Sequence, residues 1–171
     1  MNKNLITYLV GGAVIIGFIV VMALVSGGKI INSDKSLSYS MGALSVLSGD
    51  YNFGTISMAD GKVPHNFEVK NESNEPVVIS KVYTSCMCTI AYVIEENGER
   101  HGEYGMLMQG GPSGEVGIEI PAGKSVILEA VFDPAAHGPE GTGKVKRVVY
   151  LETNSRTKPK LEVIFEAEVI K

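Results

Sequence analysis

An uncharged apolar run near the N-terminus sets the first limit on the fold. It covers residues 5–25, and a helix of about 20 apolar residues is long enough to cross the hydrocarbon core of a bilayer. Backbone polar groups in lipid must be satisfied within the segment, so a single apolar span is expected to be a helix. Gly11, Gly12 and Gly17 fit this interpretation, because glycine is common in membrane helices. The sequence therefore predicts one transmembrane helix over residues 5–25.

A cleaved secretory signal peptide is the main alternative to an anchor. Such peptides have an apolar region of about 7–15 residues and a small-residue cleavage site of the A-x-A type. The present run is longer and lacks that pattern, although residues 26–28 are Ser-Gly-Gly. No cysteine follows the run, which argues against a lipoprotein anchor. We therefore expect the helix to remain attached.

The flanking residues define the expected arrangement around the membrane. Basic residues favour the cytoplasmic side, but Lys3 before the span and Lys29 and Lys35 after it do not settle the orientation. We expect residues 1–4 to form a short cytoplasmic tail. Residues 26–42, rich in Gly, Ser and Lys, are expected to be a flexible linker. The prediction is a single-pass plasma membrane protein whose C-terminal domain is extracytoplasmic, in the periplasm or at the cell surface.

Residues 43–171 show the pattern of an all-β domain. Short alternating or β-branched segments are separated by turn residues, and none has a helical period. A domain of about 130 residues can bury a core without a metal or disulfide. Regularly spaced strands of this kind favour a sandwich or barrel. The expected strands are 44–47, 63–70, 77–83, 89–94, 117–120, 125–132, 144–152 and 161–170.

Several blocks of sequence resemble a known family. They include the Phe53-Gly54 step, Ser85-Cys86-Met87-Cys88-Thr89, Val131-Phe132-Asp133-Pro134 and Glu152-Thr153-Asn154. Together they resemble the bacterial domain of unknown function 1573 family, related to hydin-type immunoglobulin-like domains. The resemblance covers most of residues 44–171, with Met87 where members usually have Gly and with residues 95–116 as an insertion. It implies an immunoglobulin-like antiparallel β-sandwich, often exported and membrane-attached, and no established reaction.

The two cysteines of the chain, Cys86 and Cys88, are the most reactive candidates. If they lie in a strand, alternate residues point to the same face, so the two thiols would be presented together. They could form a local disulfide in an oxidising compartment, although the i, i+2 spacing strains the bond unless the backbone bends. They could also bind a soft metal ion or remain as two reduced thiols.

Three methionines extend the metal hypothesis to copper(I). Met87 lies between the cysteines, and Met106 and Met108 follow His101 in a glycine-rich segment. Thiolates and thioethers are ligands that Cu(I) prefers. Methionine also fills irregular apolar gaps, so these residues have a purely structural interpretation as well. The candidate metal ligands are Cys86, Cys88, Met87, Met106 and Met108, and no other cofactor is expected.

Other chemistry finds little support in the sequence. The three histidines lie in different segments: we expect His65 to share a strand face with Phe67 and His137 to be solvated. No nucleophile, base and orienting group occur together, so we expect no enzyme. Without Lys3 the chain has 14 basic against 19 acidic residues, a net charge of −5, which disfavours nucleic acid.

Two functions remain. The first is a membrane-anchored binding or scaffold module that meets another envelope protein through loops or an edge strand. The second is a Cu(I)-binding or thiol-redox domain built on Cys86-Met87-Cys88. The sequence favours the first and does not identify the partner.

The predicted anchor is testable by fractionation. If residues 5–25 form an uncleaved span, the full-length polypeptide should stay with the membranes after a carbonate wash. Recovery of the unprocessed chain in the carbonate-washed soluble fraction would show that the segment is not a membrane anchor.

Overall fold

The computed structural model describes residues 38–107 and 114–171. Within these ranges no helix is long and apolar enough to span a bilayer. The expected tail at 1–4, the expected transmembrane helix at 5–25, residues 26–37 of the expected linker, and Met108 lie outside the described residues.

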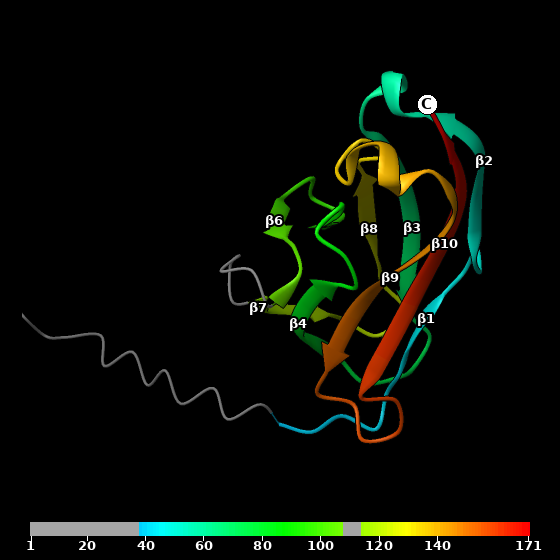
Figure 1. Ribbon diagram of the computed structural model, residues 1–171. Helices are drawn as coiled ribbons and strands as arrows, with labels where there is room; N and C mark the ends of the chain where they lie inside the picture. The colour runs from blue at the N-terminus through cyan, green and yellow to red at the C-terminus, as the bar shows by residue number, and fades with distance from the viewer. Residues whose placement is uncertain (1–37, 108–113) are drawn as a thin grey trace, which may run out of the picture. The chain divides into compact units, whose positions relative to one another are not determined.

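The described residues form two β-sheets that pack as a sandwich (Figure 1). One sheet has the strand order β1-β3-β8-β5-β6, and the other has the order β2-β10-β9-β4-β7. Two short 3-10 helices, η1 (Met58–Asp60) and η3 (Gly138–Gly141), lie in connections. The strands are β1 (Leu44–Val46), β2 (Tyr51–Ser57), β3 (Val63–Asn71), β4 (Val77–Thr84), β5 (Thr89–Ile94), β6 (Arg100–Tyr104), β7 (Glu115–Ile120), β8 (Ser125–Phe132), β9 (Gly143–Thr153) and β10 (Lys160–Ile170).

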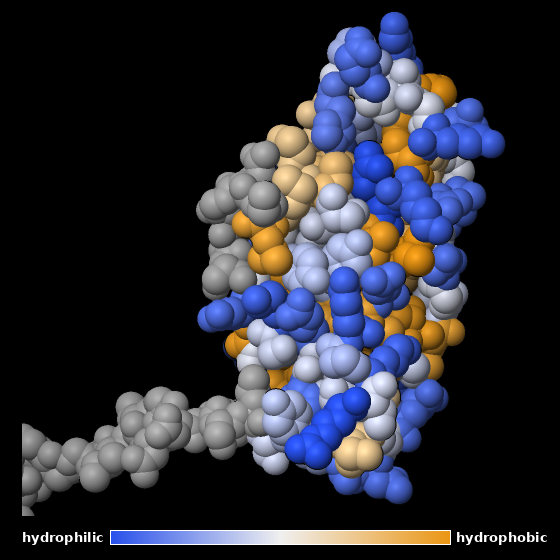
Figure 2. Space-filling model, turned by 60° about the horizontal axis from the view of Figure 1, so that its bottom comes forward, coloured by the Kyte–Doolittle hydropathy of each residue, from blue (hydrophilic) through white to orange (hydrophobic). Residues whose placement is uncertain are grey.

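The core is built from side chains that alternate along the strands. In β8 every second residue from Val126 to Phe132 is buried, and β10 repeats the pattern from Leu161 to Val169. Because successive side chains of a strand point to opposite faces, this alternation gives each sheet one apolar face. The outward positions are largely polar, and the surface in Figure 2 is mostly hydrophilic with smaller hydrophobic areas.

The structure confirms the all-β two-sheet sandwich and all eight expected strands. Sequence analysis missed β2 and β6. In β2 the burial alternation is weak, and Gly54 has a φ of 70°, at which a β-branched or bulky residue would be strained. The expectation of a wholly antiparallel sandwich is wrong at one pair, because β2 runs parallel to β10.

The first described residues are attached to the domain, although residues 26–42 were expected to be a linker. The backbone N–H of Ser40 donates to the carbonyl of Asn154 at 3.0 Å, and the N–H of Arg156 donates to the carbonyl of Ser40 at 2.9 Å. The Asn154 amide also donates to the carbonyl of Ser38 at 2.6 Å. These contacts place residues 38–42 within the domain.

The central strand β8 offers a direct test of the core. Leu128 is fully buried, so Leu128→Ala should lower the free energy of unfolding by about 2–5 kcal/mol, through lost apolar burial and a residual cavity. Chemical denaturation of the full-length chain measures this change. The exposed Glu68 on the neighbouring strand provides the control, since Glu68→Ala should change stability by less than about 0.5 kcal/mol. Equal effects of the two substitutions would contradict the assigned core.

Candidate functional site

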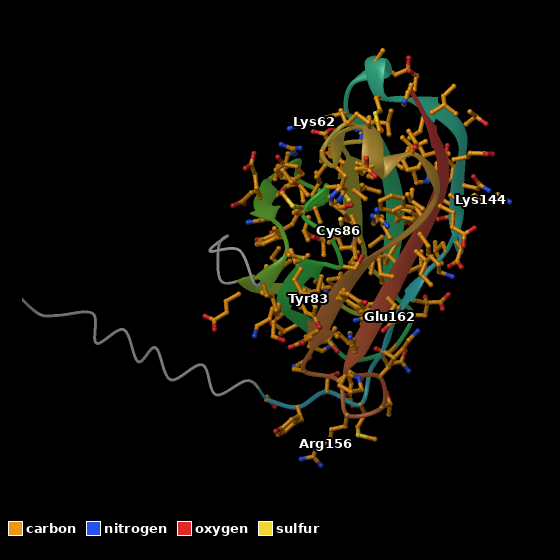
Figure 3. The ribbon with its side chains drawn as sticks, in the orientation of Figure 1. Lys62, Tyr83, Cys86, Lys144, Arg156 and Glu162 are labelled. Atoms are coloured by element: carbon orange, nitrogen blue, oxygen red, sulfur yellow. The ribbon has the colours of Figure 1, made fainter. Side chains whose placement is uncertain are left out.

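The Cys-Met-Cys motif lies in the turn that carries the chain from β4 in one sheet to β5 in the other. The N–H of Thr89 donates to the carbonyl of Cys86 at 3.1 Å, which closes the turn. The buried Thr84 hydroxyl lies 3.0 Å from the carbonyl oxygens of both Cys86 and Thr89. The cysteines therefore do not lie in a strand, and the expectation of a shared strand face does not apply to them. A bend in the backbone brings their sulfur atoms within 4.8 Å of each other, and Figure 3 labels Cys86 in this connection.

The two thiols differ in exposure. Cys88 is buried, at 2% exposed, whereas Cys86 is half-buried at the edge of the core. The backbone N–H of Cys88 donates to the Cys86 sulfur at 3.4 Å. Both side chains are free thiols in the structure. A reagent approaching from solvent therefore meets Cys86 first.

A histidine from a distant segment completes one side of the site. His137 Nε2 lies 3.1 Å from Cys86 Sγ. The loop after β8 brings His137 there, because the N–H of Asp133 donates to the carbonyl of Cys88 at 2.8 Å. A Cβ on Gly141 would come within 2.8 Å of the His137 Cβ. Glycine at position 141 therefore lets η3 close against the histidine.

Arg147 approaches the buried thiol from the opposite sheet. Its position in β9 alternates with the buried Val149 and Leu151, so it lies on the inward side of the strand. Its Nε donates to Cys88 Sγ at 3.0 Å, and its second nitrogen donates to the carbonyl of Lys146 at 2.9 Å. A guanidinium beside a sulfur favours the thiolate form of that sulfur.

The surroundings separate the acidities of the two thiols. Burial opposes ionisation of Cys86, but hydrogen bonds from the Cys88 thiol and N–H and from His137, together with the charge of Arg147, lower the pKa of Cys86 to about 7. Burial raises the pKa of Cys88, and the neighbouring Cys86 adds to the rise, while Arg147 opposes it. The more exposed sulfur is therefore the more acidic one, as expected of a nucleophilic cysteine.

The structure describes two of the three expected methionines. Met87 is 54% exposed, Met106 is half-buried after β6, and Met108 lies outside the described residues. His101 pairs with Glu95, with 2.7 Å between Nε2 and Oε1. The proposed metal ligation by Cys86, Cys88, Met87, Met106 and Met108 stays a prediction.

His137 and Arg147 are the residues that sequence analysis missed. His137 was expected to be solvated; it is exposed, but it also contacts Cys86. No local pattern links a loop histidine to a thiol 51 positions earlier. Arg147 did leave a signal, since it interrupts the inward apolar positions of an otherwise regular strand. His65 lies on the inward face with Phe67, as expected, and stacks on Tyr51 with 3.4 Å between ring centroids.

A shallow pocket opens beside the cluster. It has a volume of about 440 Å³ and includes His137, Thr142, Lys144 and Arg147 in its lining. Its walls therefore include His137 and Arg147, the two side chains that contact the sulfurs.

Comparison by sequence identifies one family. Residues 44–107 match the family described as "Protein of unknown function (DUF1573)". This confirms the resemblance over that range, which contains the Cys86-Met87-Cys88 motif. No curated protein sequence matches the chain.

Comparison by structure supports the fold alone. A protein of unknown function from Porphyromonas gingivalis W83 is similar, with a TM-score of 0.55 and 17% sequence identity over 79% of this chain and 51% of that chain. The present chain thus spans about half of that protein. Weaker similarities include the secreted serine protease VesC from Vibrio cholerae (TM-score 0.47, 11% identity, 74% and 23% of the two chains). Another is the ASH / PapD-like domain of human CEP192, with a TM-score of 0.43 and 13% sequence identity over 78% of this chain and 90% of that chain.

The acidity of Cys86 can be measured by alkylation. Iodoacetamide reacts with the thiolate, so the rate at Cys86 should rise with pH around a midpoint near 7. His137→Ala removes one of the groups that favour the thiolate, and the midpoint should move upward. Mass spectrometry of the modified peptides separates Cys86 from Cys88, and His101→Gln is the matched control. An unchanged midpoint in His137→Ala would contradict the role given to that histidine.

Proposed function

We propose that this chain is a membrane-tethered dithiol redox domain whose cysteines exchange disulfides with a partner outside the cytoplasm. The observation that supports this function best is the asymmetric pair of thiols. Cys86 is half-exposed and lies 3.1 Å from His137, while Cys88 is buried and receives a hydrogen bond from Arg147. A nucleophilic sulfur with a protected partner sulfur is the arrangement that thiol–disulfide exchange requires.

The exchange proceeds in two balanced steps. The Cys86 thiolate attacks one sulfur of a substrate disulfide, forming a mixed disulfide and releasing the other sulfur as a thiolate. Cys88 then loses its proton to solvent or to the released thiolate, and its sulfur attacks Cys86 Sγ. The substrate leaves as its second thiolate, and the domain is left with a Cys86–Cys88 disulfide. Two electrons pass from the domain to the substrate, and the reverse sequence returns them.

The positions of the side chains suit both steps. All three ligand atoms of Cys86, Cys88 and His137 lie within 4.8 Å of one another, so the second attack needs only a local rearrangement. The turn bends the backbone between the cysteines, which reduces the strain expected of this spacing in a straight strand. Arg147 stabilises negative charge on Cys88 when it becomes the attacking group.

The expected location agrees with this chemistry. The predicted span at 5–25 holds the domain at the plasma membrane, on the extracytoplasmic side, where disulfides form and persist. The partner is another envelope protein that presents an accessible disulfide or thiol pair.

A binding or scaffold module is the second candidate. The strands β6 and β7 end their respective sheets, and an edge strand can accept a strand from another chain. This interpretation needs no reaction at the cysteines. It predicts that substitution of both cysteines leaves partner binding intact.

Trapping of a mixed disulfide tests the redox proposal. In oxidised glutathione, full-length Cys88→Ser should accumulate one glutathione on Cys86, because no second sulfur is present to release it. Cys86→Ser should remain largely unmodified, since Cys88 is buried. The wild-type chain should lose two hydrogens and recover them in reduced glutathione. Intact-mass spectrometry measures all three species.

The reciprocal pattern would contradict the assigned roles. Trapping in Cys86→Ser and not in Cys88→Ser would exchange the attacking and resolving cysteines. A wild-type chain that neither gains nor loses hydrogens across the glutathione range would leave the binding module as the better function.

A further inference from the structure

We propose that Cys86, Cys88 and His137 form a three-coordinate site for copper(I), with two sulfur ligands and one nitrogen ligand. The site uses the same two thiols as the proposed function but does not depend on disulfide exchange. Its third ligand is the imidazole of His137, in place of the thioethers of Met87, Met106 and Met108 that the sequence suggested.

The spacing of the three ligand atoms fits one metal ion. They all lie within 4.8 Å of one another, and Cys86 Sγ is 3.1 Å from His137 Nε2. Metal bonds to sulfur and imidazole nitrogen are about 2.0–2.3 Å long, so ligands around a single ion lie about 3.5–4 Å apart. Small side-chain adjustments are therefore enough to place an ion between them.

The ligand types select the class of metal. Thiolate sulfur prefers Cu(I), and imidazole also binds copper. The second group with metal-ligand spacing in the described residues, Glu95, Glu99 and His101, offers two carboxylates and one imidazole. That set suits harder ions and already contains a short His101–Glu95 contact, so it does not compete for Cu(I).

Charge balance favours a monovalent ion over zinc. Two thiolates, a neutral imidazole and Cu(I) carry a net charge of −1. The Arg147 guanidinium, 3.0 Å from Cys88 Sγ, compensates this charge in a partly buried position. With Zn(II) the same ligands would be neutral, and the nearby arginine would be left without a negative partner. Arg147 is thus a positioning residue for the loaded site.

Anaerobic titration with Cu(I) alone, in competition with a chromophoric Cu(I) chelator, tests the inference on the reduced full-length chain. We expect one equivalent to bind, with X-ray absorption showing two sulfur ligands and one nitrogen ligand. His137→Ala should weaken binding by at least about tenfold, as should Arg147→Gln, whereas Arg147→Lys should restore part of the affinity. His101→Gln is the matched control and should bind as the wild type does. The unfolding midpoint of each variant verifies that it is folded. His137→Gln is a second substitution that also removes the imidazole ligand, in case His137→Ala does not fold.

Several results would overturn the copper site. These are the absence of stoichiometric binding, unchanged affinity in His137→Ala, or stronger binding of Zn(II) than of Cu(I). Loss of binding in Met106→Leu or Met108→Leu, with His137→Ala unaffected, would show that the third ligand is a thioether and not the imidazole.

The glutathione trap on Cys88→Ser distinguishes the copper site from the proposed redox function. Trapping without copper binding removes this inference alone, whereas copper binding without trapping removes the redox function alone.

Discussion

Face-to-face packing of the two sheets is the constraint on which the rest of the structure depends. It requires a largely apolar inner face on each sheet, and the regular burial of alternate residues in β8 and β10 provides much of it. The few polar groups in this interior are satisfied. The buried Asn71 amide, for example, donates to the carbonyls of Glu75 and Ile120, so burying it does not leave an unpaired group. Among the described residues, the interior of the sandwich therefore contains no buried side-chain polar atom without a hydrogen-bond partner.

The site follows from the need of the chain to pass between the sheets. Stacked sheets lie about 10 Å apart, and residues 85–88 cross that distance between β4 and β5. The connection from β8 to β9 crosses the other way and carries His137. The hydrogen bond from Asp133 to Cys88 joins the two crossings. Sulfur, imidazole and guanidinium thus meet at one place because two crossings and an inward arginine of β9 converge there.

The sequence predicted what is encoded locally. Strands with strong alternation, such as β8 and β10, were found with nearly correct ends, and the Cys-Met-Cys motif pointed to the segment that carries the candidate site. β2 and β6 were missed because their burial alternation is weak or irregular. His137 lies 51 positions from Cys86, and a contact at that separation depends on tertiary packing. Arg147 was detectable in principle, as a charge on an apolar strand face whose burial requires a partner.

Redox exchange and copper binding place opposed demands on the same two sulfurs. A Cys86–Cys88 disulfide has no thiolate to offer, so it cannot ligate Cu(I), and a bound ion occupies the lone pair with which Cys86 would attack. Each state therefore excludes the other. Arg147, which contacts the Cys88 sulfur, stabilises the negative charge of the copper-loaded site, whereas the neutral disulfide offers it no negative partner. The supply of oxidant and of Cu(I) around the domain then decides which state it adopts.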